Sequence, residues 1–176
     1  WWWENPAPNF VPGIPWTRYF IKNSGSTQHH DEMFGDFTGD GIPELIFWNQ
    51  GASTLFMAAI PVDPRNNQPW SLTPVFTYSG SRREGLARGD VDGDGLEDIV
   101  GGGNWYKYNG NGTFAVHEID NDMVFTRAAV GQLKTGGRPE VVFQAGDCDG
   151  PLRWYEGDGS SWIRHELLQR VRRGHS

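Results

Sequence analysis

The chain is poor in cysteine, in positive charge and in long apolar segments, and each shortage excludes a class of protein. Its single cysteine, Cys148, cannot form an internal disulfide. Its net charge of −7 argues against a broad surface for nucleic acid or acidic membranes. No stretch approaches the ~20 apolar residues of a membrane-spanning helix. The motifs of a nucleophile elbow, a P-loop and a dinucleotide-binding loop are also missing.

Glycine and aromatic residues are abundant instead. Glycine supplies 24 of the 176 residues, and 14% of the chain is Phe, Trp or Tyr. A disordered chain would lack those aromatic residues. No helical periodicity runs long enough to compete with short strands joined by tight turns, so the composition favours an all-β fold.

Three segments repeat one template of strand, glycine-rich loop and strand. Their loops begin at Asp36, Asp90 and Gln132, at spacings of 54 and 42 residues. These intervals match a four-stranded propeller blade of ~40–50 residues. An aromatic third strand and a fourth strand complete each repeat, and the N-terminus carries the second half alone. The sequence therefore predicts fourteen strands arranged as about three and a half blades of a β-propeller.

The repeat also predicts where each blade begins and ends. The expected units are a half blade at 1–28, blades at 29–82, 83–124 and 125–172, and the start of another at 173–176. Propellers close so that few strand edges stay exposed. We therefore expect the chain to be part of a larger ring, or to need further blades or another chain to complete one.

The second loop has the pattern of a calcium-binding hairpin. Asp90, Asp92, Asp94 and Asp98 alternate along it, and the Leu96 carbonyl is a further expected ligand. Ca²⁺ prefers about 6–8 oxygen ligands, and four carboxylates this close would repel one another without a cation. Glycines between them permit the turn. The alternative is a solvated acidic turn.

The other two loops are progressively less acidic. The first loop is predicted to bind Ca²⁺ more weakly, with the ligands Asp36, Thr38, Asp40, the Ile42 carbonyl and Glu44. The third loop has Gln132, Lys134, Gly136 and Glu140 at corresponding positions, and Lys134 can supply a charge where the cation would lie. We predict no Ca²⁺ there. Asp147 and Asp149 are interpreted as an acidic turn.

The segment Asp90–Asp98 resembles the FG-GAP or VCBS repeats, whose motif is Asp-x-Asp-x-Asp-Gly-x-x-Asp between the first two strands of a blade. The resemblance implies a propeller, usually seven-bladed, with structural calcium in its loops. Because such repeats occur in integrin α chains, lectins and bacterial surface proteins, it also implies an extracytoplasmic location, secreted or periplasmic.

A second candidate site follows from the register of the blades. His30 and Glu84 each lie six residues before their loops, and His175 follows at a blade-like interval. First strands line a propeller's channel, so these side chains are expected to converge at its mouth. Two imidazoles and a carboxylate suit Zn²⁺ or another divalent metal. The alternative is a hydrogen-bonded plug. The neighbours predicted to contact a ligand are His29, Asp31, Arg83 and Arg127.

Two functions remain open at this stage. One is a calcium-stabilised propeller that binds a carbohydrate or a protein, or serves as a scaffold. The other is a fragment of a sugar-acting carbon–oxygen lyase, because several segments resemble the propeller domain of aldos-2-ulose dehydratase; His30, Glu84 and His175 would then be catalytic.

The recurring tryptophans, Trp3 and Trp16 among them, are predicted to pack in the core. Trp1 and Trp48 do not recur and are left open for ligand contact.

Overall fold

The computed structural model describes residues 1–158 and 161–172, and these residues form an all-β chain with one short 3₁₀ helix. In chain order the elements are β1 (Trp2–Glu4), β2 (Thr17–Tyr19), β3 (His29–Gly35), β4 (Glu44–Asn49), η1 (Gln50–Ala52), β5 (Thr54–Ala59), β6 (Leu72–Thr77), β7 (Ala87–Gly89), β8 (Asp98–Gly101), β9 (Asn104–Gly110), β10 (Thr113–Glu118), β11 (Thr126–Gly131), β12 (Glu140–Ala145), β13 (Gly150–Gly157) and β14 (Trp162–Val171).

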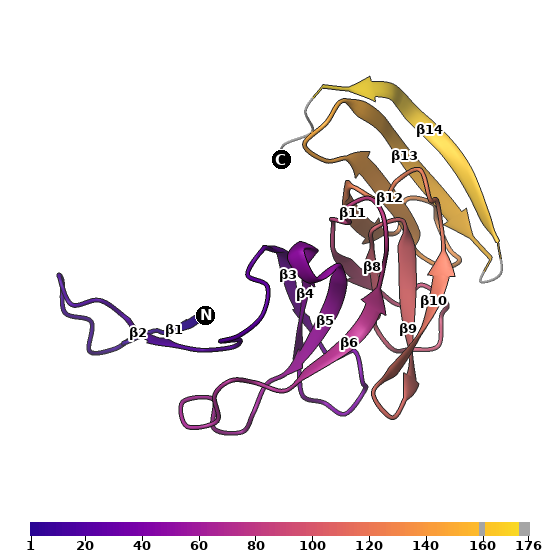
Figure 1. The fold of residues 1–176 in the computed structure, drawn as a ribbon. Helices are drawn as coiled ribbons and strands as arrows, with labels where there is room; N and C mark the ends of the chain where they lie inside the picture. Colours follow the sequence, from indigo (N-terminus) through magenta and orange to yellow (C-terminus); the bar gives the residue numbers. More distant parts are fainter. Residues whose placement is uncertain (159–160, 173–176) are drawn as a thin grey trace.

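These strands form three four-stranded antiparallel sheets and one two-stranded sheet. The sheets are β3-β4-β5-β6, β7-β8-β9-β10 and β11-β12-β13-β14, each in chain order, and β1 pairs with β2 (Figure 1). Every connection within a sheet is a simple hairpin step, as local antiparallel pairing favours. The predicted fold class is confirmed, because this architecture is that of partial propeller blades.

Consecutive sheets pack face to face and share their cores. In β4, Leu45 and Phe47 pack with the residues nearest β1 and β2, while Ile46 and Trp48 pack toward the second sheet. This alternation follows from the period of two in a strand, and it buries both faces of a central sheet. A further core, which includes Val100 of the second sheet, joins it to the third.

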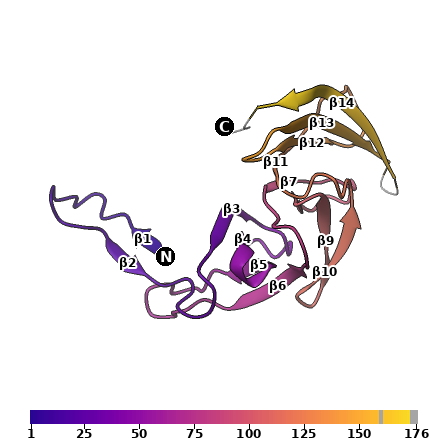
Figure 2. The same cartoon turned by 45° about the horizontal axis from the view of Figure 1, so that its top comes forward.

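The sheets follow one another around an arc, and this arrangement positions the candidate sites. Figure 2 shows β3, β7 and β11 on the inner side of the arc, with β6, β10 and β14 on the outer side. β11 contacts β7 and β8, and β6 contacts β10. The loop after each first strand therefore lies beside the corresponding loop of its neighbour, because the strands repeat in register.

The tryptophans behave differently from their predicted roles at three positions. Trp3 and Trp16, predicted to be buried, are 52% and 44% exposed. They belong to the segment of β1 and β2, which form a two-stranded sheet with no further strand among the described residues. Trp48, for which the sequence leaves ligand contact open, is 0% exposed, and its indole Nε1 donates to the Gly85 carbonyl at 2.9 Å. Trp48 therefore connects the first sheet to the second, through its packing and through this hydrogen bond.

Candidate metal loops and the network between the sheets

The first loop folds around the carboxylate of Asp36. Asp36 Oδ1 accepts from the backbone amides of Gly39 and Asp40 at 2.9 and 3.1 Å, and its Oδ2 accepts from Gly41 at 2.9 Å. Gly39 and Gly41 have φ of 72° and 84°, a region that glycine adopts without strain. The sequence therefore folds this way because both left-handed positions carry glycine.

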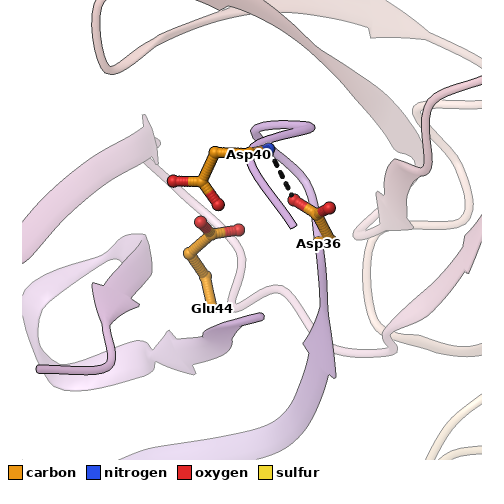
Figure 3. A group of neighbouring side chains, drawn as sticks. All are labelled: Asp36, Asp40 and Glu44. Atoms are coloured by element: carbon orange, nitrogen blue, oxygen red, sulfur yellow. Dashed lines mark hydrogen bonds between the residues drawn. The ribbon is translucent and has the colours of Figure 1, made fainter. Parts of the chain in front are cut away.

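This turn brings three carboxylates together. Asp36, Asp40 and Glu44 each offer an oxygen, and these oxygens lie within 4.8 Å of one another. Figure 3 shows the carboxylates of Asp40 and Glu44 facing each other across the loop. Thr38, another predicted ligand, donates its hydroxyl to Glu44 Oε1 at 2.9 Å. The loop thus holds an acidic triad at the place the sequence predicts, while the Ile42 carbonyl ligand stays a prediction.

The second loop repeats the same local geometry. Asp90 accepts from Gly93, Asp94 and Gly95 at 2.7, 2.9 and 2.9 Å. Oxygens of Asp90, Asp92 and Asp98 lie within 4.8 Å of one another. Asp94 is outside this triad; its Oδ1 accepts from the Leu96 amide at 2.9 Å. The Leu96 carbonyl ligand also stays a prediction.

The charges around the second loop are uneven. Asp98 is 3% exposed, and burial together with repulsion from Asp92 and Asp94 raises its pKa to about 7. Asp94, by contrast, has a lowered pKa, because the ammonium of Lys107 bonds to its carboxylate at 2.6 Å. Lys107 comes from β9 and also bonds to Asp92. A cation therefore already lies against two of the four carboxylates.

The third loop keeps the hairpin but changes its chemistry. Gln132 Nε2 donates to the Gly136 carbonyl at 2.8 Å, whereas Asp36 and Asp90 accept from backbone amides. Glu140 Oε2 accepts from the Leu133 amide at 2.7 Å. The Lys134 ammonium reaches across to Glu156 of β13. The ammonium of Lys134, predicted to take the place of the cation in the loop, therefore pairs with Glu156 of β13 instead.

The donor set of the first two loops fits a hard divalent cation. Each triad offers carboxylate oxygens at close spacing, and each includes one buried carboxylate, Glu44 or Asp98. Carboxylate, hydroxyl and carbonyl oxygens are the ligands Ca²⁺ prefers. Within residues 1–158 and 161–172, groups of three or more His, Cys, Asp or Glu side chains that could hold a metal ion occur in these two loops alone. Acidic triads that can hold a metal ion such as Ca²⁺ are thus present.

A separate network joins the three sheets on their inner side. Glu84 is 1% exposed, and its Oε1 lies 3.1 Å from His30 Nδ1. The same oxygen accepts from Gln50 Nε2 at 3.0 Å. Its Oε2 lies 3.2 Å from Arg127 NH1, which also reaches Asp31 Oδ1 at 3.5 Å. Burial raises the pKa of Glu84, although these partners oppose the shift.

The network contains only part of the predicted mouth. His30, Asp31, Glu84 and Arg127 lie together, and their roles toward a ligand stay predictions. His29 lies on the other face of its strand and stacks on Phe47, with ring centroids 5.2 Å apart. The Arg83 side chain bonds instead to the Gly102 carbonyl. His175 lies outside the described residues.

The sequence missed one central member, Gln50, which contacts Glu84 from η1. No motif marks Gln50. It reaches Glu84 because β4 ends at Asn49 and η1 begins at Gln50, beside the segment that contains Glu84. Asp147, interpreted as part of an acidic turn, lies 3.5 Å from Arg127 NH2 and so extends the network.

A cleft lies between the N-terminal segment and the first four-stranded sheet, beside the core in which Trp2 packs against Leu45 and Phe47. Its volume is about 690 Å³. Aromatic rings dominate part of its lining, and polar groups such as Glu32 and Asn23 supply the rest. The aromatic members are Trp1, Trp2, Phe20, Phe34, His29 and Phe47. Trp1 is 49% exposed there.

Comparison with known proteins gives no match for this chain among family models, curated proteins or solved structures. Among the described residues, no helix is long and apolar enough to cross a membrane. Its class is therefore an all-β chain of several four-stranded antiparallel sheets that carries acidic triads able to hold a metal.

Proposed function

We propose that the chain is a calcium-stabilised β-propeller module of the FG-GAP or VCBS type, which acts outside the cytoplasm as a binding domain or scaffold. The observation that carries the proposal is the repeated loop geometry. Asp36 and Asp90 each organise a turn through three backbone amides, and each turn gathers carboxylate oxygens within 4.8 Å.

Calcium explains these loops better than a solvated acidic turn does. Burial of the ninth loop residue does not by itself call for a metal, because Glu44, Asp98 and Glu140 are all buried and each accepts from a backbone amide. The first two loops differ from the third in placing three carboxylates within 4.8 Å of one another, and a divalent cation offsets the repulsion between them. Calcium modules outside the cell bind at about 10⁻⁴–10⁻³ M, a range that partly exposed loops with few carboxylates suit.

The proposal is tested by thermal unfolding with calcium and with a chelator. Binding to the native state alone adds about 2.7 kcal/mol per site at a hundredfold excess over Kd. For a chain of this size, that raises Tm by about 5–10 °C. Glu44→Gln and Asp98→Asn should each remove part of the rise.

Glu140→Gln is the matched control, because Glu140 occupies the corresponding position of the third loop and makes the corresponding backbone bond. It should leave the calcium response unchanged. Equal melting curves with calcium and with chelator would refute the proposal.

For the partner of the module, we propose a carbohydrate bound in the cleft beside β1. Flat rings next to carboxylate and amide groups suit a sugar, because its apolar face stacks while its hydroxyls hydrogen-bond. A glycan array tests this with the wild-type chain and Trp1→Ala. Binding that the variant loses supports the assignment. Binding that it keeps, or no bound glycan, contradicts it.

A sugar lyase with His30 as its base is the second candidate, favoured by the 3.1 Å contact between His30 and Glu84. Against it, both Glu84 oxygens already have partners, which is the pattern of a hydrogen-bonded plug. His30→Ala decides between them. Loss of divalent-metal or sugar binding supports the lyase, and unchanged binding with lower stability supports the plug.

A further inference from the structure

In each four-stranded sheet, we compare the third residue of the loop after the first strand with the aligned residue of the third strand. The charges of these two residues differ from sheet to sheet. The strand pairings Leu45–Ala58, Ile99–Tyr106 and Val141–Tyr155 align the three sheets. The next residue along each third strand is then Ala59, Lys107 or Glu156. The facing loop residues, each third in its loop, are Thr38, Asp92 and Lys134.

The same contact is thus built with opposite polarity in two sheets. In the second sheet the strand supplies the cation, Lys107, and the loop supplies Asp92. In the third sheet the loop supplies the cation, Lys134, and the strand supplies Glu156. In the first sheet the corresponding positions hold Thr38 and Ala59, and neither residue is charged. An ion pair between loop and third strand is therefore a recurring alternative to a bound metal.

Only in the second sheet does that ion pair use the proposed metal ligands. Lys107 Nζ bonds to Asp92, a member of the acidic triad, and to Asp94 at 2.6 Å. An ammonium and Ca²⁺ cannot both lie against one carboxylate without strong repulsion between the two cations.

A second cation approaches the same loop from the next sheet. A Cβ built on Gly93 would lie 3.5 Å from Nε of Arg138. At the corresponding place in the first loop, a Cβ on Gly39 would lie 2.8 Å from Cδ2 of Leu96. Arg138 and Leu96 are equivalent residues of successive loops. The second loop therefore has a charged neighbour where the first has an apolar one. Arg138 NH1 is buried and has no hydrogen-bond partner among the described residues.

We infer that Lys107 is a built-in competitor of calcium at the second loop: its ammonium neutralises Asp92 and Asp94 in the metal-free protein and must leave when the ion binds. This inference rests on the proposed calcium function. It means that counting carboxylates overstates the affinity of the second loop. It also means that calcium binding frees a lysine on the surface of β9.

The first test is a calorimetric calcium titration in an Asp40→Asn background, which weakens the first loop. Lys107→Met should bind calcium about tenfold more tightly than the parent, since it removes a positive charge a few ångströms from the ion. Lys134→Met is the matched control and should stay within twofold of the parent. Lys107→Arg, which keeps the charge, should retain the weak binding.

The second test uses the wild-type chain and needs no folded variant. Lysine acetylation is measured by mass spectrometry with calcium and with chelator. Calcium should raise labelling of Lys107 severalfold and leave Lys134 unchanged.

The possible failures are distinguishable. If calcium binds but Lys107→Met has the parent's Kd, or Lys107 labelling does not change, the competition is refuted while the calcium function stands. If neither the parent nor Lys107→Met binds calcium, the calcium function of this loop fails and the competition fails with it.

Discussion

Trp48→Phe should destabilise the chain well beyond an ordinary substitution. The indole is 0% exposed, packs edge-on against Tyr78 and Tyr106, and donates to the carbonyl of Gly85, which lies in the segment that leads into β7. Phenylalanine keeps the rotamer and most of the apolar area but loses the donor. The unpaired carbonyl costs about 1–3 kcal/mol and the lost volume about 1 kcal/mol more. Against a total stability of about 5–15 kcal/mol, this loss is large.

Urea unfolding followed by far-ultraviolet circular dichroism measures this loss, because the midpoint and slope of the transition give the free energy of unfolding whatever the amplitude of the signal. Trp1→Phe is the control, since Trp1 is about half exposed and should change stability by less than about 0.5 kcal/mol. A Trp48→Phe variant within that same margin of the wild type would refute the view that the Trp48–Gly85 contact joins the first two sheets.

Three further predictions concern the inner network and the loops. Gly85→Ala should destabilise strongly, because Gly85 has φ of 82° and a Cβ there would lie 2.7 Å from the Thr126 carbonyl; urea unfolding measures it. Burial raises the pKa of Glu84, so the folded state keeps a proton that the unfolded state loses, and stability should fall as pH rises above the ordinary value of 4.5. Glu84→Gln should flatten that fall, and equal pH slopes in the two proteins would contradict the reasoning. Asp36→Ala should destabilise even in chelator, by about 1–3 kcal/mol, because three loop amides lose their acceptor.

The sequence predicts the strands and acidic loops well because both follow local rules. The aspartates and glycines of the second loop determine its turn within nine residues, and the repeat transfers that geometry to the first loop. Strand alternation should also have separated His29 from His30, since neighbours on a strand point to opposite faces. His29 therefore stacks on Phe47, while His30 contacts Glu84.

The remaining contacts depend on register between distant segments. Lys107 meets Asp92 through the pairing of β8 with β9. Gln50 of η1 meets Glu84, which lies in the segment that leads into β7 of the second sheet. Trp48 lies within the apolar strand β4, but nothing in its own segment identifies Gly85 as its acceptor. Such contacts become visible only when the sheets are placed against one another.

The three loops share one hairpin shape although their charges differ. In all of them the ninth residue, Glu44, Asp98 or Glu140, accepts from the backbone amide of the second residue at 2.7–3.0 Å. The third loop makes this bond although Glu140 is its only carboxylate and Lys134 adds a positive charge. Closing the hairpin therefore does not require a metal. In the proposed function, calcium therefore binds a turn that is already formed, where it offsets the repulsion between the added aspartates. Removing calcium should therefore lower stability without unfolding the sheets, and the loop that already has a lysine on its carboxylates should lose least.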